Sequence, residues 1–357
     1  MNGRPVQILL RVILALCFAV FPAVSAVAQG FAGLGAAAEG FTQPSRDIPV
    51  SFPRDHGPHP DFRIEWWYLT ANLQDADGTK YGLQWTLFRS AMAPEEKDGW
   101  ASPQIWMGHA AVTTPTAHYV AERLARGGIG QAGARADPFS AWIDDWEMTA
   151  TGDGIDALEL RARGTDFGYD MTLSATGPIV LQGDRGYSVK STGGRASYYY
   201  SQPFYEISGT LRLPERDVTV TGTAWLDREW ASQPLGDTQI SWDWFSMVFD
   251  GGERLMGFTL HDSETGDFTA ATWIASDGTP TPYPNGAFQS RPLETAQVAG
   301  RDVPVVWQVL LPDKGIDVTV RALNPQAWMD TSVSYWEGPV TITGSHPGRG
   351  YLEMTGY

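Results

Sequence analysis

Two carboxylates stand two positions apart in the segment TAWLDREW, residues 223–230. If this segment is a β-strand, the alternation of its side chains places Trp225, Asp227 and Glu229 on one face. Neighbouring carboxylates repel each other, so on a dry face the pKa of one acid rises and that acid stays protonated near neutral pH. This spacing predicts a proton donor. In the alternative, structural interpretation, Asp227 and Glu229 bind neighbouring arginines or lie in solvent at the end of the strand.

A second acid can be paired with a base in the segment 52–89. Its two apolar runs are separated by DADG, residues 75–78, which is typical of a hairpin turn. A three-residue loop with a left-handed glycine places Glu65 opposite Arg89, at the end of an aromatic wall that includes Trp67 and Trp85. We therefore predict a structural ion pair between Glu65 and Arg89, and an enclosed aromatic surface beside it.

The rest of the chain favours strands throughout. Short apolar runs are separated by Gly, Pro and Asp, and the 15 Trp, 15 Phe and 13 Tyr suit pleated surfaces. Only residues 94–98 and 116–126 show a helical pattern. This pattern predicts an all-β protein built from β-barrels or β-sandwiches.

Further strand pairs place more aromatic residues. We expect strands over 198–213 and 218–230, and a hairpin of 240–249 with 254–261. A two-residue loop in that hairpin would put Phe245 and Met247 on one face with Met256, and His261 opposite Trp242. A last pair of strands is expected over 333–343 and 351–357.

The start of the chain resembles an export signal. Residues 1–28 combine Arg4 and Arg11 with an apolar stretch and a small-x-small cleavage site near Ala28. Residues 29–47, rich in Ala and Gly, are expected to form a flexible lead-in. The segment 231–238 is the best linker, so we predict an N-terminal domain over 48–232 and a C-terminal domain over 239–357. Export predicts a periplasmic or secreted protein.

Composition excludes several classes of function. The net charge of −16 argues against binding nucleic acid. The single cysteine, Cys17, lies inside the expected signal, which leaves no thiolate chemistry and no disulfide. No later segment is apolar enough to span a membrane. The loop that contains His56 and His59 is expected to be a rigid cap, and we predict no metal site.

Six separated stretches resemble the secreted AttH-type family, which is related to the carotenoid 1,2-hydratases, also called hydroxyneurosporene synthases. They occur in order between Phe52 and Tyr357 and cover nearly the whole chain beyond the signal. The resemblance implies two lipocalin-like β-barrel domains in tandem, with an apolar cavity at or between them. It also implies a hydrophobic substrate, often a polyene or isoprenoid. The stretches are FPRDHGPHPDFRIEWWYLT, YGLQWTLFR, ASYYYSQPFYEISGTL, TGTAWLDREWASQPL, ISWDWFSMVFDGGERLMGF and YWEGPVTITGSHPGRGYLEMTGY.

The resemblance also implies a cofactor-free hydratase chemistry. Asp227 would protonate an alkene, Glu229 would adjust its pKa, and Trp225 with Tyr198–Tyr200 would stabilise the resulting cation. One departure matters, because the family acid is commonly followed by histidine where this chain has Arg228. An arginine directed at Asp227 would depress the pKa of the acid, but strand alternation sends Arg228 to the opposite face.

Two functions follow from these observations. The first is a periplasmic lipocalin-like protein that binds an extended hydrophobic ligand, with an envelope ABC-transport system as a candidate partner. The second is a cofactor-free hydratase, lyase or isomerase that acts through Asp227. A secreted hydrolase ranks last, because the sequence has no G-x-S-x-G motif. The residues expected to contact the ligand are Trp67, Trp85, Tyr198, Tyr200, Trp225, Trp242, Trp244 and His261.

Overall fold

The computed structural model describes residues 39–357 except 234 and 237. The expected signal, 1–28, and the first part of the expected lead-in, 29–38, therefore lie outside the described residues. The described chain consists of strands with three short 3-10 helices, η2 (Arg54–His56), η3 (Gly99–Ala101) and η4 (Pro312–Lys314). The prediction of an all-β chain is confirmed.

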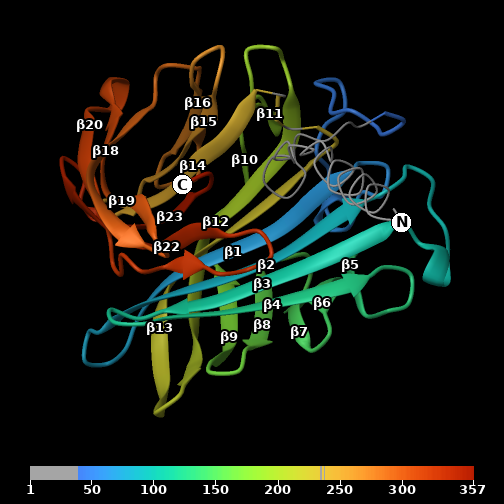
Figure 1. Ribbon diagram of the computed structural model, residues 1–357, viewed down its shortest axis with the longest axis horizontal. Coiled ribbons are helices and arrows are strands. Elements are labelled where there is room, and N and C mark those ends of the chain that lie inside the picture. The colour runs from blue at the N-terminus through green and yellow to red at the C-terminus, as the bar shows by residue number, and fades with distance from the viewer. Residues whose placement is uncertain (1–38, 234, 237) are drawn as a thin grey trace, which may run out of the picture.

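The first sheet is 13-stranded and curls into a nearly closed barrel, in the order β4-β3-β2-β1-β13-β12-β9-β8-β7-β6-β5. Two short strands, β10 and β11, pair with β12 outside this path. The ends of the path approach each other where β4 lies against β6 (Figure 1). The strands are β1 (Ile64–Gln74), β2 (Lys80–Ala91), β3 (Gln104–Thr113), β4 (His118–Arg126), β5 (Ala132–Ala136), β6 (Phe139–Ile143), β7 (Trp146–Ala150), β8 (Ala157–Arg163), β9 (Gly168–Ala175), β10 (Val180–Leu181), β11 (Tyr187–Val189), β12 (Ala196–Leu213) and β13 (Arg216–Ala231).

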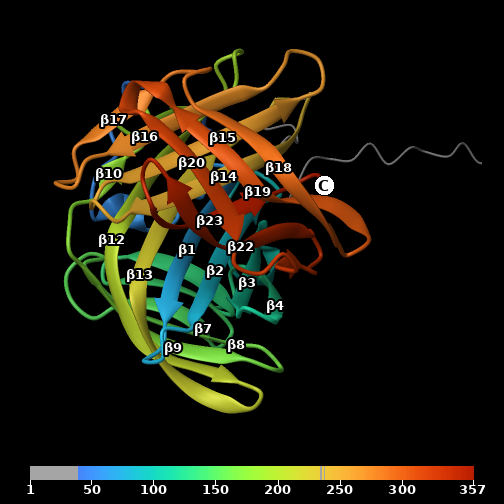
Figure 2. The same cartoon turned by 90° about the vertical axis from the view of Figure 1, so that its left-hand side faces the viewer.

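The second sheet is 10-stranded and more open, in the order β17-β16-β15-β14-β23-β22-β20-β19-β18, with β21 paired to β22. In Figure 2 it lies across the first sheet, with β22 and β23 nearest to β1 and β2. Its strands are β14 (Gln239–Phe249), β15 (Arg254–Asp262), β16 (Phe268–Ile274), β17 (Pro280–Tyr283), β18 (Gln289–Val298), β19 (Arg301–Leu311), β20 (Ile316–Ala322), β21 (Trp328–Met329), β22 (Tyr335–Gly344) and β23 (Gly348–Met354).

The β1–β2 hairpin shows how local sequence sets register. Asp75 and Thr79 close a loop in which Gly78 adopts φ +80°, a conformation that glycine reaches without strain. The resulting register places Glu65 opposite Arg89 and Leu69 opposite Trp85. The inward face of β1 therefore carries Glu65 and a run of apolar side chains into the barrel.

Two expectations about local structure are wrong. Residues 118–126 form β4, because their backbone pairs with β3 along its whole length. Residues 94–98 form no helix: 94 and 95 are in a bend and 96–98 have no regular structure. The β14–β15 hairpin has a three-residue loop closed between Phe249 and Glu253, with Gly252 at φ +96°. The extra loop residue shifts the pairing by one, so His261 lies opposite Ser241 and not Trp242.

Both faces of the central strands are buried, which explains their nearly continuous apolar sequence. One face of β1 fills the first barrel and the other packs against the second sheet. A separate apolar layer between the two sheets is built from residues of both, among them Ile64, Tyr68, Tyr199, Trp225, Trp244, Phe258 and Tyr351. Over the described residues, helices long and apolar enough to cross a membrane are absent.

Candidate functional site

The layer between the sheets contains an apolar cavity that is lined by side chains of both sheets. Its empty volume, open mouth included, is about 820 Å³. The outer face of the first sheet forms one wall and the outer face of the second sheet forms the other. The lining residues are Ile64, Trp66, Tyr68, Thr86, Phe88, Lys190, Tyr199, Asp227, Glu229, Leu235, Trp242, Trp244, Phe258, Leu260, Tyr335 and Glu353.

Asp227 is the acid in the first-sheet wall. It is 2 % exposed and accepts hydrogen bonds from Ser201 Oγ and from Trp225 Nε1, the latter at 2.7 Å. Burial raises its pKa from 3.8 to about 7, against hydrogen bonds from Ser201, Trp225 and Tyr199 that lower it. No ion pair among the described residues includes Asp227, so burial, with no cation bound to the carboxyl, allows a substantial protonated fraction at neutral pH.

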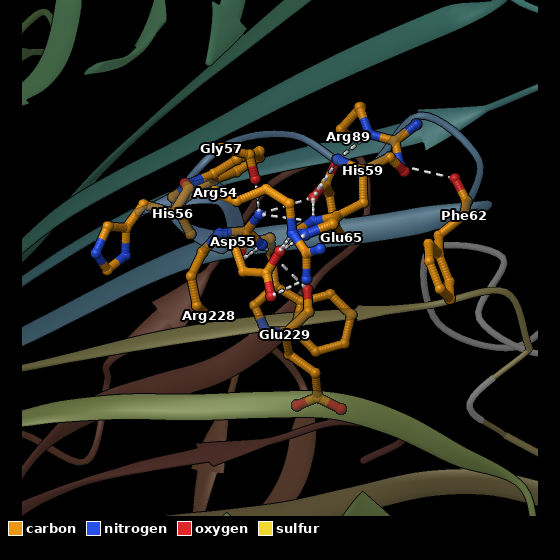
Figure 3. A network of polar contacts seen from close by, with 12 residues as sticks. Arg54, Asp55, His56, Gly57, His59, Phe62, Glu65, Arg89, Arg228 and Glu229 are labelled. Carbon is orange, nitrogen blue, oxygen red and sulfur yellow. Dashed lines mark hydrogen bonds and ion pairs between the residues drawn. The ribbon is translucent and has the colours of Figure 1, made fainter. Parts of the chain in front are cut away.

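Arg228 lies on the opposite face of β13, as strand alternation predicts. Its guanidinium stacks on Trp67 at 3.8 Å and donates to Glu65 Oε2 at 2.8 Å, inside the first barrel. Figure 3 shows Arg228 directed into the network around Glu65, with Glu229 pointing away from it. Arg228 therefore does not lower the pKa of Asp227.

Glu65 holds the centre of that barrel network. Arg89 lies opposite it across the hairpin and forms an ion pair through its Nε. His59 contributes its main-chain N–H at 2.9 Å and its ring Nδ1 at 3.0 Å (Figure 3). The charges of Arg89 and Arg228 hold the pKa of the fully buried Glu65 well below its ordinary value, although burial alone would raise it.

Glu229 has a cationic partner in the cavity. Lys190, just after β11, reaches its carboxylate at 2.9 Å. The same ammonium lies over the rings of Phe258, at 4.4 Å, and Tyr199, at 4.8 Å. The charge of Glu229 raises the pKa of Asp227, but it is the smallest of the causes acting on that group. Sequence reasoning missed Lys190, since a single lysine after a short strand carries no pattern.

Two further acids come from the second sheet and were also missed. Glu337 on β22 and Glu353 on β23 are direct cross-strand neighbours. Like charges in such a position destabilise a sheet, so at neutral pH the pair holds fewer than two negative charges. Burial, together with the charge of Glu353, raises the pKa of Glu337 well above its ordinary value. Burial raises the pKa of Glu353 to about 7. We expected the turn to lie between residues 343 and 351. The turn is shorter, between Gly344 and Gly348, and this shift in pairing places the two acids opposite each other.

Hydroxyl and indole groups surround this carboxyl pair. Tyr68 from the first sheet donates to Glu337 Oε1 at 2.5 Å, and Trp242 Nε1 donates to Glu353 Oε1 at 2.6 Å. These neutral donors hold the pair without supplying positive charge. The second wall therefore contributes its own proton-carrying groups to the same cavity as Asp227.

The expected ligand contacts divide into two groups. Trp242 and Trp244 line the cavity, and Trp225 lies behind Asp227. Trp67, Trp85, Tyr198 and Tyr200, by contrast, lie in the core of the first barrel. Their strands alternate as expected, but the cavity lies on the outer face, where Trp66 and Tyr199 project instead.

His261 also lies away from the cavity. Its Nε2 lies 2.8 Å from Asp243 Oδ2, and its Nδ1 lies 3.1 Å from Asp267 Oδ2. The hydrogen bond to Asp243 raises its pKa to about 9. Its role is to link two acids at the edge of the second sheet. The one-residue shift in the hairpin accounts for this difference from the sequence expectation.

The loop with His56 and His59 caps the first barrel. His56 Nδ1 lies 2.8 Å from the hydroxyl of Tyr200, and His59 stacks on Trp230 with ring centroids 4.0 Å apart. Both imidazoles are thus used in packing and hydrogen bonds. The described part of the chain contains no group of three or more His, Cys, Asp or Glu side chains suited to a metal ion.

Comparison with known proteins places the chain. The sequence matches the AttH-like family over residues 43–357, and it matches no curated protein. A crystal structure from Nitrosomonas europaea, provisionally described as AttH, is similar with a TM-score of 0.80 and 32 % identity, covering 89 % of this chain and 99 % of that one.

Two more distant structures share the fold. Kievitone hydratase from Nectria haematococca has a TM-score of 0.66 at 14 % identity, over 89 % of this chain and 97 % of its own. CghA, solved with Sch210972, has a TM-score of 0.57 at 14 % identity over the same shares. The family match spans nearly all of the described residues and the fold agrees with it. The chain belongs to the AttH-like family.

Proposed function

We propose that this protein is a cofactor-free lyase or isomerase that acts on a carbon–carbon double bond of an extended apolar molecule. The observation that carries the proposal is the environment of Asp227, a buried and uncharged acid in the wall of an apolar cavity. A carboxylic acid with a pKa near 7 can both give and recover a proton at neutral pH. Sequence reasoning ranked ligand binding first, and the dry placement of Asp227 favours catalysis instead.

The chemical step follows from the groups in the two walls. Asp227 transfers its proton to one alkene carbon, so the π electrons form a C–H bond and leave a tertiary cation on the other carbon. In a hydratase, water then adds to the cation and Glu353 accepts the proton that the water loses. In an isomerase, Glu353 accepts a proton from a neighbouring carbon and the double bond moves. In both reactions Glu353 then releases its proton to water and Asp227 takes one up from water, which restores both groups to their starting states. The reverse of the first sequence is dehydration.

Aromatic walls suit this cation. The faces of Trp66, Trp244 and Phe258 present negative quadrupole potential and no nucleophilic lone pair, so they stabilise positive charge without capturing it. Fixed donors and rings need no reorganisation during the step. Lys190 is neutralised by Glu229 and so does not oppose the cation.

The apolar lining of the cavity favours an apolar substrate. An apolar cavity with few polar groups binds by burial of apolar surface and uses the polar groups for orientation. The resemblance noted in the sequence points to a polyene or isoprenoid, and the relative called kievitone hydratase carries a hydratase name. Periplasmic location and a partner in envelope transport stay predictions.

Ligand carriage without turnover is the second candidate, favoured by the same apolar lining. To identify the ligand class, native mass spectrometry of protein from its own cells should be combined with organic extraction. A bound polyene or lipid then becomes the test compound. An empty protein shifts the search to transiently bound alkenes.

The decisive test uses Asp227→Asn with a recovered or candidate alkene in D₂O. The wild type should place deuterium on an alkene carbon, and the variant should lose this incorporation while still binding the compound. Asp317→Asn, an exposed acid on β20, is the control and should react like the wild type. A folded Asp227→Asn protein that exchanges at the wild-type rate would overturn the proposal. Binding by the wild type with no exchange of any bound alkene would favour carriage.

A further inference from the structure

An apolar row crosses the outer face of the first sheet from the cavity to the surface. The register places Trp66 on β1 opposite Phe88 on β2, Phe88 opposite Met107 on β3, and Met107 opposite Leu124 on β4. These four strands run side by side (Figure 1). Directly opposed residues of antiparallel strands share one face, so the four side chains form a continuous line. Trp66 and Phe88 line the cavity, so the row begins in the cavity wall.

The exposure of the row rises toward its outer end. Trp66, Phe88 and Met107 are partly buried, and Leu124 is 58 % exposed. Ile105 lies two positions before Met107, on the same face of β3, and is 43 % exposed. Single apolar residues on a surface need no explanation, but a contiguous set marks a site of interaction. This set continues the wall of an apolar cavity into solvent.

The second sheet is fastened along the neighbouring row of the same face. That row consists of Thr86, His109 and Glu122, which lie opposite one another on β2, β3 and β4. His109 Nδ1 lies 3.0 Å from the hydroxyl of Tyr335, and Glu122 Oε1 accepts the main-chain N–H of Ser332 at 3.0 Å. The apolar row therefore lies just beside the line where the two sheets are joined, and the second sheet borders it on one side.

We propose that Phe88, Ile105, Met107 and Leu124 form an open groove that binds the far end of a slender hydrocarbon chain, the reacting part of which lies at Asp227. The position of the reacting part rests on the proposed function, whereas the groove rests on the register and exposure of the row. Neighbouring strands lie about 4.8 Å apart, so the four steps from β13 to β4 span about 19 Å. A ligand that fills both cavity and groove is therefore an extended chain and not a compact ring system.

The width of the row favours a chain over a flat partner such as a membrane. On β4 the residues two positions before and after Leu124 on the same face are Glu122 and Arg126. The apolar strip is therefore one side chain wide at its outer end, with a charge on either side. A hydrocarbon chain that leaves the cavity can bury this strip without removing either charge from water.

Calorimetric titration with two uncharged alcohols of different length tests the groove. The short chain of n-octanol fits within the cavity, whereas the long chain of oleyl alcohol must extend beyond it. In Leu124→Asp we expect the affinity for oleyl alcohol to fall by about tenfold or more, because a charged group replaces apolar surface under the chain. The affinity for n-octanol should stay at the wild-type value. Ile105→Asp should show the same selectivity for chain length, and Leu124→Met should bind both alcohols like the wild type.

Leu293→Asp is the matched control, since Leu293 is an exposed leucine on β18, outside the cavity and the row. It should bind both alcohols like the wild type. Unchanged affinity for oleyl alcohol in folded Leu124→Asp and Ile105→Asp would overturn the groove. Equal weakening of both alcohols would also overturn it, since the effect would then lie in the cavity or the fold. The same holds if the wild type binds neither alcohol, or if the substitutions reduce only the binding of phosphatidylcholine vesicles.

These outcomes are separate from the test of the proposed function. Selective loss of oleyl alcohol in Leu124→Asp, together with no exchange of any bound alkene in D₂O, would keep the groove and assign it to ligand carriage. Deuterium incorporation by the wild type with unchanged binding of oleyl alcohol in the variants would keep the enzyme and remove the groove.

Discussion

At the scale of single residues, the alternation of β13 separates two groups that would otherwise neutralise each other. Asp227 faces an apolar cavity, and the next residue, Arg228, faces the barrel network around Glu65. A one-residue slip would exchange these positions, place a guanidinium in the cavity and lower the pKa of the acid. The chemistry thus depends on register as much as on residue type.

The raised pKa of Asp227 predicts a specific dependence of stability on pH. Because the pKa is about 7 in the folded protein and 3.8 ordinarily, folding favours the protonated acid. Its stabilising contribution is complete below about pH 4 and is lost as the pH rises through about 7. Asparagine does not ionise, so from about pH 4 to about pH 8 the stability of Asp227→Asn should rise relative to wild type, by on the order of 4 kcal/mol.

Urea unfolding of both proteins at several pH values measures this difference. Glu337 and Glu353 remain in both proteins, so their titration largely cancels from the comparison. A difference in unfolding free energy that stays constant with pH would show that Asp227 titrates normally in the folded protein.

At the scale of elements, the β1–β2 hairpin is held at its open end by a buried ion network. Glu65→Gln would leave Arg89 and Arg228 inside the first barrel without their common carboxylate. Removing one partner of a buried pair costs about 3–5 kcal/mol. We expect Glu65→Gln to lose stability of this size, as measured by denaturant unfolding.

The exposed pair of Glu294 and Arg321 supplies the matched control. Glu294→Gln should leave the unfolding free energy nearly unchanged, since surface ion pairs contribute little. The lowered pKa of Glu65 also predicts how stability depends on pH. The stabilising contribution of Glu65 is present above the ordinary carboxyl pKa and is lost as the pH falls well below that value. Equal stability of Glu65→Gln and wild type at neutral pH would refute the structural role of the network.

At the scale of the whole molecule, the site exists because two sheets meet. Gly82 on β2 lies at their contact, where an added Cβ would come within 2.5 Å of Pro339 Cγ on β22. Gly82→Ala should therefore push the sheets apart and destabilise the protein by about 1–3 kcal/mol. Gly152→Ala is the control, since no atom lies within 4 Å of its Cβ position.

In Gly82→Ala the midpoint temperature of thermal unfolding should fall and less ligand should be retained. Both quantities should remain unchanged in Gly152→Ala. Loss of stability without loss of ligand would mean that the cavity tolerates a change in the spacing of the sheets. Unchanged behaviour in both respects would show that the contact at Gly82 is loose.

The sequence alone determined the class of the fold and the pairing of its nearest strands. Alternation and turn residues are local, so they were sufficient to predict the all-β chain and to put Asp227 and Arg228 on opposite faces of one strand. They failed where one loop residue changed a register, as at His261, and at 116–126, where a helical pattern was expected but 118–126 form β4.

Only the tertiary structure decided which face became the site. A strand has two faces, and with aromatic residues on both, the sequence does not state which one closes a barrel and which one meets a second sheet. Packing of the second sheet turned the outer face into the cavity, so Trp66 and Tyr199 line it while Trp67 and Tyr200 fill the core. Lys190 reaches Glu229, and Glu353 joins the cavity that Asp227 and Glu229 line, from distant parts of the chain. Contacts of that range have no local signal.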